Sequence, residues 1–193
     1  MSALTFSVAA DTPDDFTRTI ARARRGDLDA FESLIRQYER LVLATALRLT
    51  GNLSDAQDAS QDVFLKLYRN LPKVEASENL SAWLYPVTVN VCHDHRRKRP
   101  AAAPLDDAAV IPSHAPDPHR IAAGAERRHA IALSLRLLSE KERAALVLRD
   151  LEGLPTAEVA RILGSTDATV RSQIAKARIK MKDFMERYFR RRS

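Results

Sequence analysis

Residues 138–178 read LSEKERAALVLRDLEGLPTAEVARILGSTDATVRSQIAKAR, and they contain the clearest structural pattern in the chain. Ser139 and Glu142 have the spacing of a capping box, which predicts a helix that begins near Glu140. This helix is expected to end at Gly153, since glycine readily adopts the left-handed backbone found after helices. The first part of the stretch is therefore predicted to be one helix with a defined start and end.

Two further helices are predicted in the rest of this stretch. A short one opens at Pro155 or Thr156 and ends at Gly164. The other begins at Asp167, and its apolar residues recur at i, i+4, i+7 and i+11, so that side is expected to be buried. Short helices, a glycine turn and a basic third helix are typical of a helix-turn-helix unit that reads duplex DNA. The apolar row consists of Val170, Ile174, Ala177 and Met181.

The opposite face of this third helix carries small, polar and cationic side chains. Arg and Lys can donate to guanine or to phosphates, and Ser can pair with several base edges. A solvated face of a small helical bundle would show the same residue types, but the helix-turn-helix context favours a DNA groove. The residues of this face are Arg171, Ser172, Ala175, Lys176 and Ile179.

Composition indicates the fold class and the kind of partner. The chain has 193 residues, 45% of them hydrophobic, and only five Gly. It has no long alternating run of β-branched residues, so an all-α fold is predicted. The formal net charge of +6 favours an anionic partner. From Arg171 to the C-terminus, nine Lys or Arg stand against two acidic residues, so DNA is expected to bind at this end.

The sequence offers no candidate catalytic site. It has no Gly-rich phosphate loop, nucleophile elbow or pair of catalytic carboxylates, and Cys92, His93 and His95 match no zinc spacing. We therefore expect no enzyme activity, no metal and no cofactor. Cys92 is the only cysteine, which favours a reducing compartment. No apolar run approaches the roughly 18 residues of a membrane helix, so a soluble cytoplasmic protein is expected.

In the part of the chain before residue 138, helix start and stop signals predict further helices. Residues 1–11 lack periodicity and are expected to form a disordered tail. Thr12, followed by a proline and two acidic residues, opens a helix that ends near Gly26. Asp27 caps the next helix, which has an apolar stripe and stops at Gly51.

The following helix has an acidic face. Ser54 and Gln57 have the spacing of a capping box, and acidic residues then recur at i, i+3 and i+7, opposite an apolar stripe. In a basic protein such a face suits a cationic protein partner, although a solvated charged face is also compatible with it. The acidic stripe and its neighbours are Asp55, Asp58, Gln61, Asp62 and Leu65.

A helix from about Ala82 to Lys98 is predicted next, with Ser81 or Asn79 as its cap. Pro86 is expected to delay the start of this helix or to kink it. One line along it passes from apolar to polar to cationic side chains, which suits single-stranded nucleic acid. A buried Trp beside a helical ion pair explains the same residues equally well. The line consists of Trp83, Val87, Asn90, Asp94 and Arg97.

Residues 100–118 contain five prolines and few large apolar residues, so they are predicted to be a linker. The linker divides the chain into two helical domains, at 12–99 and 119–193. Helical spacing resumes from His119 to Leu138 at the start of the second domain.

These two domains resemble the second and fourth conserved regions of the extracytoplasmic-function (ECF) group of the bacterial sigma-70 family. Residues 26–71 and 81–99 are similar to the second region, and residues 138–178 to the fourth. The resemblance implies an RNA polymerase sigma factor that directs core polymerase to specific promoters. Such a factor helps to melt the minus-10 element and is not an enzyme.

The same resemblance implies which partners the chain has. The acidic helix would dock on the clamp helices of the polymerase β′ subunit, and the second domain on the β flap. An anti-sigma factor is also expected, because this group is commonly held inactive by one. The residues implied in binding core polymerase are Asp55, Asp58, Gln61, Asp62, Phe64 and Leu65.

Promoter contacts follow from the resemblance too. Residues 72–81 and the helix after them would capture unstacked bases of the minus-10 element. The helix from Asp167 would read the minus-35 element in the major groove, but Gln173 and Ala175 replace larger residues common in the group, so its sequence preference is open. The minus-10 residues would be Asn79, Trp83, Asn90, Asp94, Arg96 and Arg97. The minus-35 residues would be Arg149, Thr169, Arg171, Ser172, Lys176 and Arg178.

Two other classes of protein stay open at this point. A stand-alone helix-turn-helix regulator explains the second domain but leaves the acidic helix unexplained, and it would normally need a dimer. An adaptor would bind a protein with its first domain and nucleic acid nonspecifically with its basic end. Replacing Arg171 and Lys176 by Ala separates these classes, since only the adaptor would be little affected.

Overall fold

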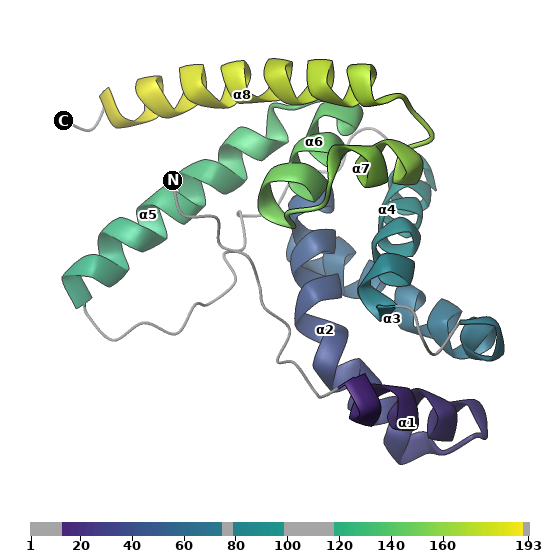
Figure 1. Cartoon of the computed structure of the whole chain (residues 1–193). Coiled ribbons are helices and arrows are strands. Elements are labelled where there is room, and N and C mark those ends of the chain that lie inside the picture. The colour runs from purple at the N-terminus through teal and green to yellow at the C-terminus, as the bar shows by residue number, and fades with distance from the viewer. Residues whose placement is uncertain (1–12, 75–78, 99–117, 191–193) are drawn as a thin grey trace.

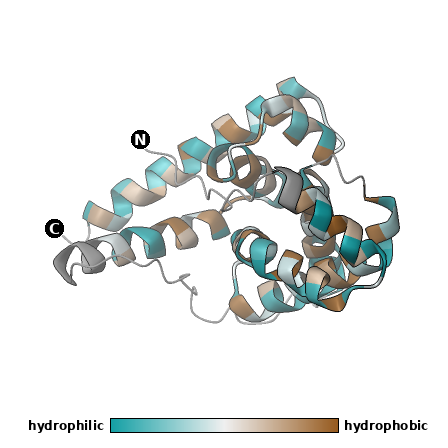
Figure 2. Ribbon diagram, turned by 60° about the horizontal axis from the view of Figure 1, so that its bottom comes forward, coloured by the Kyte–Doolittle hydropathy of each residue, from teal (hydrophilic) through white to brown (hydrophobic). Residues whose placement is uncertain are grey.

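The computed structural model describes residues 13–74, 79–98 and 118–190, and all regular elements within these ranges are helical. This confirms the predicted all-α fold. Along the helices, apolar and polar residues alternate as in amphipathic helices (Figure 2). We refer to residues 13–98 as the first half and to residues 118–190 as the second half.

The first half contains four α-helices and one short 3-10 turn. α2 and α3 pack against each other, and α1 and α4 pack against them (Figure 1). Leu34, Leu67 and Leu84 are fully buried between these helices. The elements are α1 (Pro13–Arg24), α2 (Leu28–Thr50), α3 (Leu53–Asn70), η1 (Leu71–Lys73) and α4 (Leu80–Lys98).

The predicted ends of α2 are confirmed. The Asp27 carboxylate accepts a hydrogen bond from the backbone N–H of Ala30 at 3.1 Å. At the other end, Gly51 has a φ of 82°, in the left-handed region, and its N–H donates to the carbonyl of Leu47. Local sequence signals were sufficient here because both caps act within one turn of the helix.

The predicted capping box at Ser54 is wrong. Asn52 is the N-cap of α3, and its side-chain oxygen accepts from the backbone N–H of Asp55 at 2.7 Å. Because α2 ends at Gly51, the extended residue Asn52 is the first one available as a cap, and Ser54 already lies inside the helix. The Asn52 amide also donates to the Asp55 carboxylate at 2.6 Å, so Asp55 helps to fix the start of this helix.

The expectation that Pro86 delays α4 is also wrong. The helix begins at Leu80, and the Asn79 side chain accepts from the N–H of Ser81 at 3.1 Å. Pro86 costs one backbone hydrogen bond, but Leu80 and Leu84 are fully buried on the same turns. Burial of these side chains keeps the helix continuous through the proline, since tertiary packing can override local propensity.

The second half contains the helix-turn-helix. The predicted capping box is confirmed, since the Ser139 hydroxyl accepts from the N–H of Glu142 and the Glu142 carboxylate accepts from the N–H of Ser139. Gly153 and Gly164 both have positive φ and end their helices as expected. The elements are α5 (Pro118–Arg136), α6 (Glu140–Leu146), η2 (Val147–Leu151), α7 (Thr156–Ile162) and α8 (Asp167–Arg190).

The element η2 departs from the prediction. A single helix was expected from Glu140 to Gly153, but Val147–Leu151 forms one turn of π-helix instead. Such turns are rare and often accompany functional positions. Here the wider turn carries Arg149 and Asp150, and the latter faces α8.

The two halves pack against each other. α6 and α7 lie beside the upper parts of α2 and α4, while α5 and α8 extend away from the first half on the same side (Figure 1). Ala145, Leu148 and Val159 of the second half are buried in one continuous core with the side chains of α2, α3 and α4. The predicted linker lies outside the described residues, except Pro118, which opens α5.

Arg24 fastens α1 to the segment that follows α3. Its guanidinium donates to the carbonyls of Leu71 and Pro72, both at 3.1 Å, and to the carbonyl of Val74. These carbonyls lie where α3 and η1 end, and of the three only that of Leu71 also accepts from a backbone N–H of the described residues, that of Val74 at 3.2 Å. α1 therefore stabilises the chain on its way from α3 to α4.

We expect Arg24→Ala to lower the free energy of unfolding by about 1–2 kcal/mol, because it removes charge-assisted hydrogen bonds to three carbonyls. Urea denaturation followed by circular dichroism measures the change. The matched control is Arg25→Ala, which removes the same charge from the exposed next residue. Equal effects of the two substitutions would contradict the role of Arg24.

Candidate nucleic-acid interface

One side of α8 is buried against the rest of the protein, and this burial leaves the opposite side exposed to solvent. Val170 and Ala177 are fully buried and Ile174 is 6% exposed, which confirms the predicted apolar row. Arg171, Ser172, Ala175, Lys176 and Ile179 are all exposed on the other side. A rigid helix therefore presents cationic, hydroxyl and small side chains together, as a reader of the major groove requires.

The start of α8 is fixed by a local cap. The Thr166 hydroxyl accepts from the backbone N–H of Thr169 at 3.2 Å and lies 2.9 Å from the Thr169 hydroxyl. Arg171 pairs with Asp167 one turn away, at 3.4 Å between exposed side chains. Such an exposed pair contributes little stability, so a phosphate or base can replace Asp167 at low cost.

Arg178 is engaged within the protein. Its Nε and Nη2 donate to the two carboxylate oxygens of Asp150, at 2.8 and 2.7 Å. This hydrogen bonding raises the pKa of Arg178 above its usual value. The bidentate pair fastens α8 to η2, which carries half-buried Arg149. The family resemblance implied a minus-35 contact for Arg178 but could not indicate its partner 28 residues away.

The predicted minus-10 residues divide into two groups on α4. Asn90, Asp94, Arg96 and Arg97 are exposed. Trp83 is only partly exposed and packs against the hydrophobic core. The packing of Trp83 agrees with its interpretation as a core residue, and nucleic-acid binding by the exposed polar end of the helix stays a prediction. Asn79 is exposed in front of the helix, where its side chain acts as the cap.

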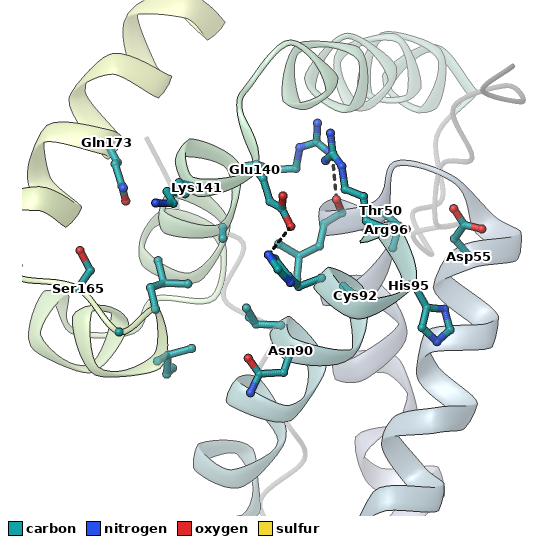
Figure 3. Close-up of a pocket in the computed structure, with 18 of the residues that line it drawn as sticks. Thr50, Asp55, Asn90, Cys92, His95, Arg96, Glu140, Lys141, Ser165 and Gln173 are labelled. Carbon is teal, nitrogen blue, oxygen red and sulfur yellow. Dashed lines mark hydrogen bonds and ion pairs between the residues drawn. The ribbon is translucent and has the colours of Figure 1, made fainter. Parts of the chain in front are cut away.

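Side chains from both predicted DNA-reading helices line one pocket between the halves. Its volume is about 780 Å³, and α4 contributes Asn90 and Arg96 to its wall. Gln173 of α8 lies on the opposite side, with Glu140 and Lys141 of α6 between it and α4 (Figure 3), and Thr169 of α8 also lines the pocket. His93 and Glu140 approach across the pocket, with 3.5 Å between Nε2 and Oε1. No signal in the sequence indicated that α4 and α8 contribute to one pocket.

The acidic face of α3 is exposed, with two exceptions. Asp58, Gln61 and Asp62 are exposed, and Leu65 is 52% exposed beside them. Asp55 is half-buried in the cap described above, and Phe64 is 8% exposed and belongs to the core.

Tyr68 extends the acidic face with an apolar surface. It is 49% exposed and stacks edge to face on Phe31 of α2, with 5.1 Å between ring centroids. The sequence analysis missed Tyr68, although its position one turn after Leu65 was a usable signal. His95 of α4 approaches Asp62 to 2.7 Å and links α4 to the acidic face.

No group of three potential metal ligands occurs among the described residues. None of the described helices is long and apolar enough to cross a membrane. Cys92 is buried on α4, and burial raises the pKa of its thiol to about 12. The thiol is therefore protonated at neutral pH and is a weak nucleophile there.

In a comparison with known proteins, each half of the chain matches a family model. Residues 34–101 match the family described as Sigma-70 region 2, and residues 128–181 match Sigma-70, region 4. The RNA polymerase sigma-H factor of Pseudomonas aeruginosa is 30% identical over 86% of this chain and 92% of its own length. The ECF RNA polymerase sigma factor SigM of Mycobacterium tuberculosis is 35% identical over 81% of this chain and 77% of its own length.

Solved structures agree with this match. The sigma factor RpoE of Bartonella quintana, in complex with the anti-sigma factor NepR, has a TM-score of 0.64 and is 25% identical. The match covers 81% of this chain and 96% of the RpoE chain. The structure of CnrH in complex with the cytosolic domain of CnrY has a TM-score of 0.61 at 24% identity and shows the same fold.

The buried thiol can be tested directly. In the native chain at neutral pH, we expect Cys92 to react with a disulfide reagent far more slowly than the same thiol in urea, because the native thiol is protonated and covered. Absorbance of the released thiolate measures both rates. Equal rates in the native and unfolded chain would show that Cys92 is accessible.

Proposed function

The chain belongs to the ECF group of the sigma-70 family, and from this premise we propose that α8 and α4 carry its two promoter-reading surfaces. As a sigma factor it acts in promoter-specific initiation by RNA polymerase, with core polymerase and promoter DNA as partners, and it is not an enzyme. The observation that carries the proposal is the sorting of α8 into one buried face and one exposed, cationic face.

In the proposed assignment, α8 reads the minus-35 element. Arg171, Ser172 and Lys176 contact base edges and adjacent phosphates in the major groove, and Thr169 lies at the entry of the helix. Arg149 holds a phosphate from the neighbouring turn. We assign Arg178 a positioning role instead, because its guanidinium is bound by Asp150.

The polar end of α4 is proposed to capture the minus-10 element. Asn90, Asp94, Arg96 and Arg97 are exposed there and can bind unstacked bases and the strand backbone. Base capture offsets part of the unpairing cost, which is a few kcal/mol for each flipped base. Asn79 and Trp83 flank this surface, Trp83 chiefly through packing.

We propose that the exposed part of the α3 face binds the β′ clamp helices of core polymerase. Asp58, Gln61 and Asp62 supply the charge and hydrogen bonds, and Leu65 and Tyr68 supply apolar area. Asp55 and Phe64, assigned to this contact by resemblance, act in the cap and the core instead. By the same family analogy, the second half contacts the β flap, the chain acts in the cytoplasm, and an anti-sigma factor like NepR binds it.

In vitro transcription tests the function as a whole. Bacterial core polymerase is incubated with and without the protein on a pool of promoter fragments from the host genome. We expect specific transcripts only when the protein is present. If polymerase gains no initiation while the protein alone shifts discrete DNA fragments, the proposal fails and a stand-alone regulator replaces it.

The double substitution Arg171→Ala with Lys176→Ala is expected to lower specific transcription roughly tenfold or more, because it removes direct contacts to the minus-35 element. The matched control is Lys182→Ala with Arg187→Ala, which removes the same charge from exposed positions farther along α8. Transcripts are quantified on one promoter at fixed salt, since phosphate contacts are salt-dependent. An equal loss in both variants would reduce the role of α8 to nonspecific charge.

A separate experiment tests the role of Arg178. It measures how tightly minus-35 duplex DNA binds to the complex of this protein with core polymerase. Arg178→Ala and Asp150→Ala should each weaken binding by about two- to fivefold, the scale of an exposed ion pair, and the double variant should be no weaker. If Arg178 contacted DNA, Asp150→Ala would leave binding unchanged or tighten it. Asp183→Ala, which removes an exposed acidic charge from α8, is the control.

A further inference from the structure

The pocket between the two halves has the size of a small-molecule site. Its volume of about 780 Å³ lies within the roughly 300–1,000 Å³ that is usual for ligand pockets. Arg96 of α4, Lys141 of α6 and Gln173 of α8 all line it (Figure 3). Residues of α2, α5 and α7 belong to its wall as well. A small molecule inside it would therefore contact both halves at once.

Buried polar contacts fix the packing of the halves that form this wall. The Glu152 side chain of the second half is only 4% exposed. Its carboxylate accepts from three donors of the first half, which are the Thr45 hydroxyl at 3.0 Å, the Arg48 guanidinium at 2.5 Å and the Tyr85 hydroxyl at 3.2 Å. A buried charge tolerates few arrangements of its partners. The two sides of the pocket are therefore held in place before any ligand binds, as in most ligand sites.

The wall of the pocket carries an excess of positive charge. Four of its side chains are Arg or Lys, and two are carboxylates. Both carboxylates have partners within the protein, since Asp55 accepts from the Asn52 amide and Glu140 lies 3.5 Å from His93. Within the described ranges, no carboxylate oxygen lies within 4.0 Å of the nitrogens of these four cations. The cations are Arg96, Arg136, Lys141 and Arg143.

Arg143 shows the effect of this excess charge. It is 5% exposed, and its guanidinium donates to the carbonyls of Leu49, Leu135, Arg136 and Leu138, which carry no net charge. Burial is the main cause that lowers the pKa of Arg143 to about 10, and the positive charge of Arg96 comes next. Glu140 opposes this shift, and the charge of Arg136 adds to it. An anion in the pocket would offset the repulsion between these cations.

The wall also offers an acceptor and an apolar surface. The Gln173 side-chain oxygen is buried, and no donor of the described residues hydrogen-bonds to it. An unpaired buried acceptor is unfavourable, so an N–H group of a ligand at this position would be bound. Val89, Ile162 and Leu163 supply apolar area for a flat ring. The pocket therefore combines the features that bind a phosphate with those that bind a ring carrying N–H groups.

We propose that this pocket is a binding site for a nucleotide, with a purine nucleoside diphosphate as the expected class. The phosphates lie against Arg96, Arg136 and Lys141, because guanidinium groups bind phosphate oxygens through paired hydrogen bonds. The ring lies on the apolar wall and donates an N–H to Gln173. Bound between the halves, the nucleotide stabilises their packing.

This site is distinct from the proposed minus-35 contact. Arg171, Ser172 and Lys176 do not line the pocket, so a bound nucleotide leaves them exposed. Asn90 and Arg96 do line it and also belong to the proposed minus-10 surface. Single-stranded nucleic acid is therefore the competing ligand that an experiment has to separate from a nucleotide.

Calorimetric titration of the full chain with GDP, ADP, pyrophosphate and guanosine tests the site. We expect GDP or ADP to bind at least about tenfold more tightly than pyrophosphate or guanosine, because neither the phosphates nor the ring alone uses the whole wall. No saturable binding of either nucleotide, or equal affinity for pyrophosphate, would overturn the proposal.

The double substitution Arg96→Ala with Arg136→Ala should lower nucleotide affinity about tenfold or more, because it removes two phosphate contacts. The matched control is Lys98→Ala with Arg127→Ala, which removes the same charge from exposed positions on the same two helices outside the pocket. This control should bind the nucleotide as the unchanged chain does. An equal loss in both double variants would reduce the binding to nonspecific charge and overturn the site.

Gln173→Leu separates the ring contact from the phosphate contacts without changing any charge. We expect nucleotide affinity to fall about threefold or more while pyrophosphate affinity stays the same, with helicity by circular dichroism retained. Nucleotide affinity that is unchanged in this variant would overturn the assigned ring position. If a single-stranded minus-10 oligonucleotide binds the chain and loses affinity in the Arg96 and Arg136 double variant, while no nucleotide binds, the cations serve nucleic acid and the proposal fails.

Discussion

The packing of the two halves depends on how one buried carboxylate is solvated. The Glu152 carboxylate loses its hydration when it is buried. Hydrogen bonds from the first half take the place of water, and their donors are Thr45, Arg48 and Tyr85. A buried charge tolerates few arrangements of its partners, since every lost donor leaves part of it uncompensated. The contact therefore fixes how the halves sit together, beyond what apolar packing alone would specify.

The reading helix shows the same division between packing and polar contacts. Val170 and Ala177 decide which side of α8 is buried. The pair of Arg178 with Asp150 then sets where the helix lies relative to the π-helical turn. A reader of the major groove needs both, because base contacts depend on the position of the helix as well as on its exposed side chains.

Local signals in the sequence predicted most elements, and their failures have local causes. Ser139 and Asp27 cap helices as expected, since a cap and its partner lie within three or four residues. Ser54 does not, because Asn52 comes first after Gly51. Phe64 lies on the core side of α3, although the family resemblance suggested a partner contact. The η2 turn had no recognisable signal in the sequence.

By itself the sequence determined the all-α class, the helix-turn-helix and the two sigma regions, because periodicity, caps and motifs act over a few residues. Only the tertiary structure decided that Glu152 meets Arg48, that Arg178 is bound by Asp150, and that α4 and α8 share a pocket. These contacts join residues 28 or more positions apart. No local pattern encodes such pairs, since they depend on how whole helices pack.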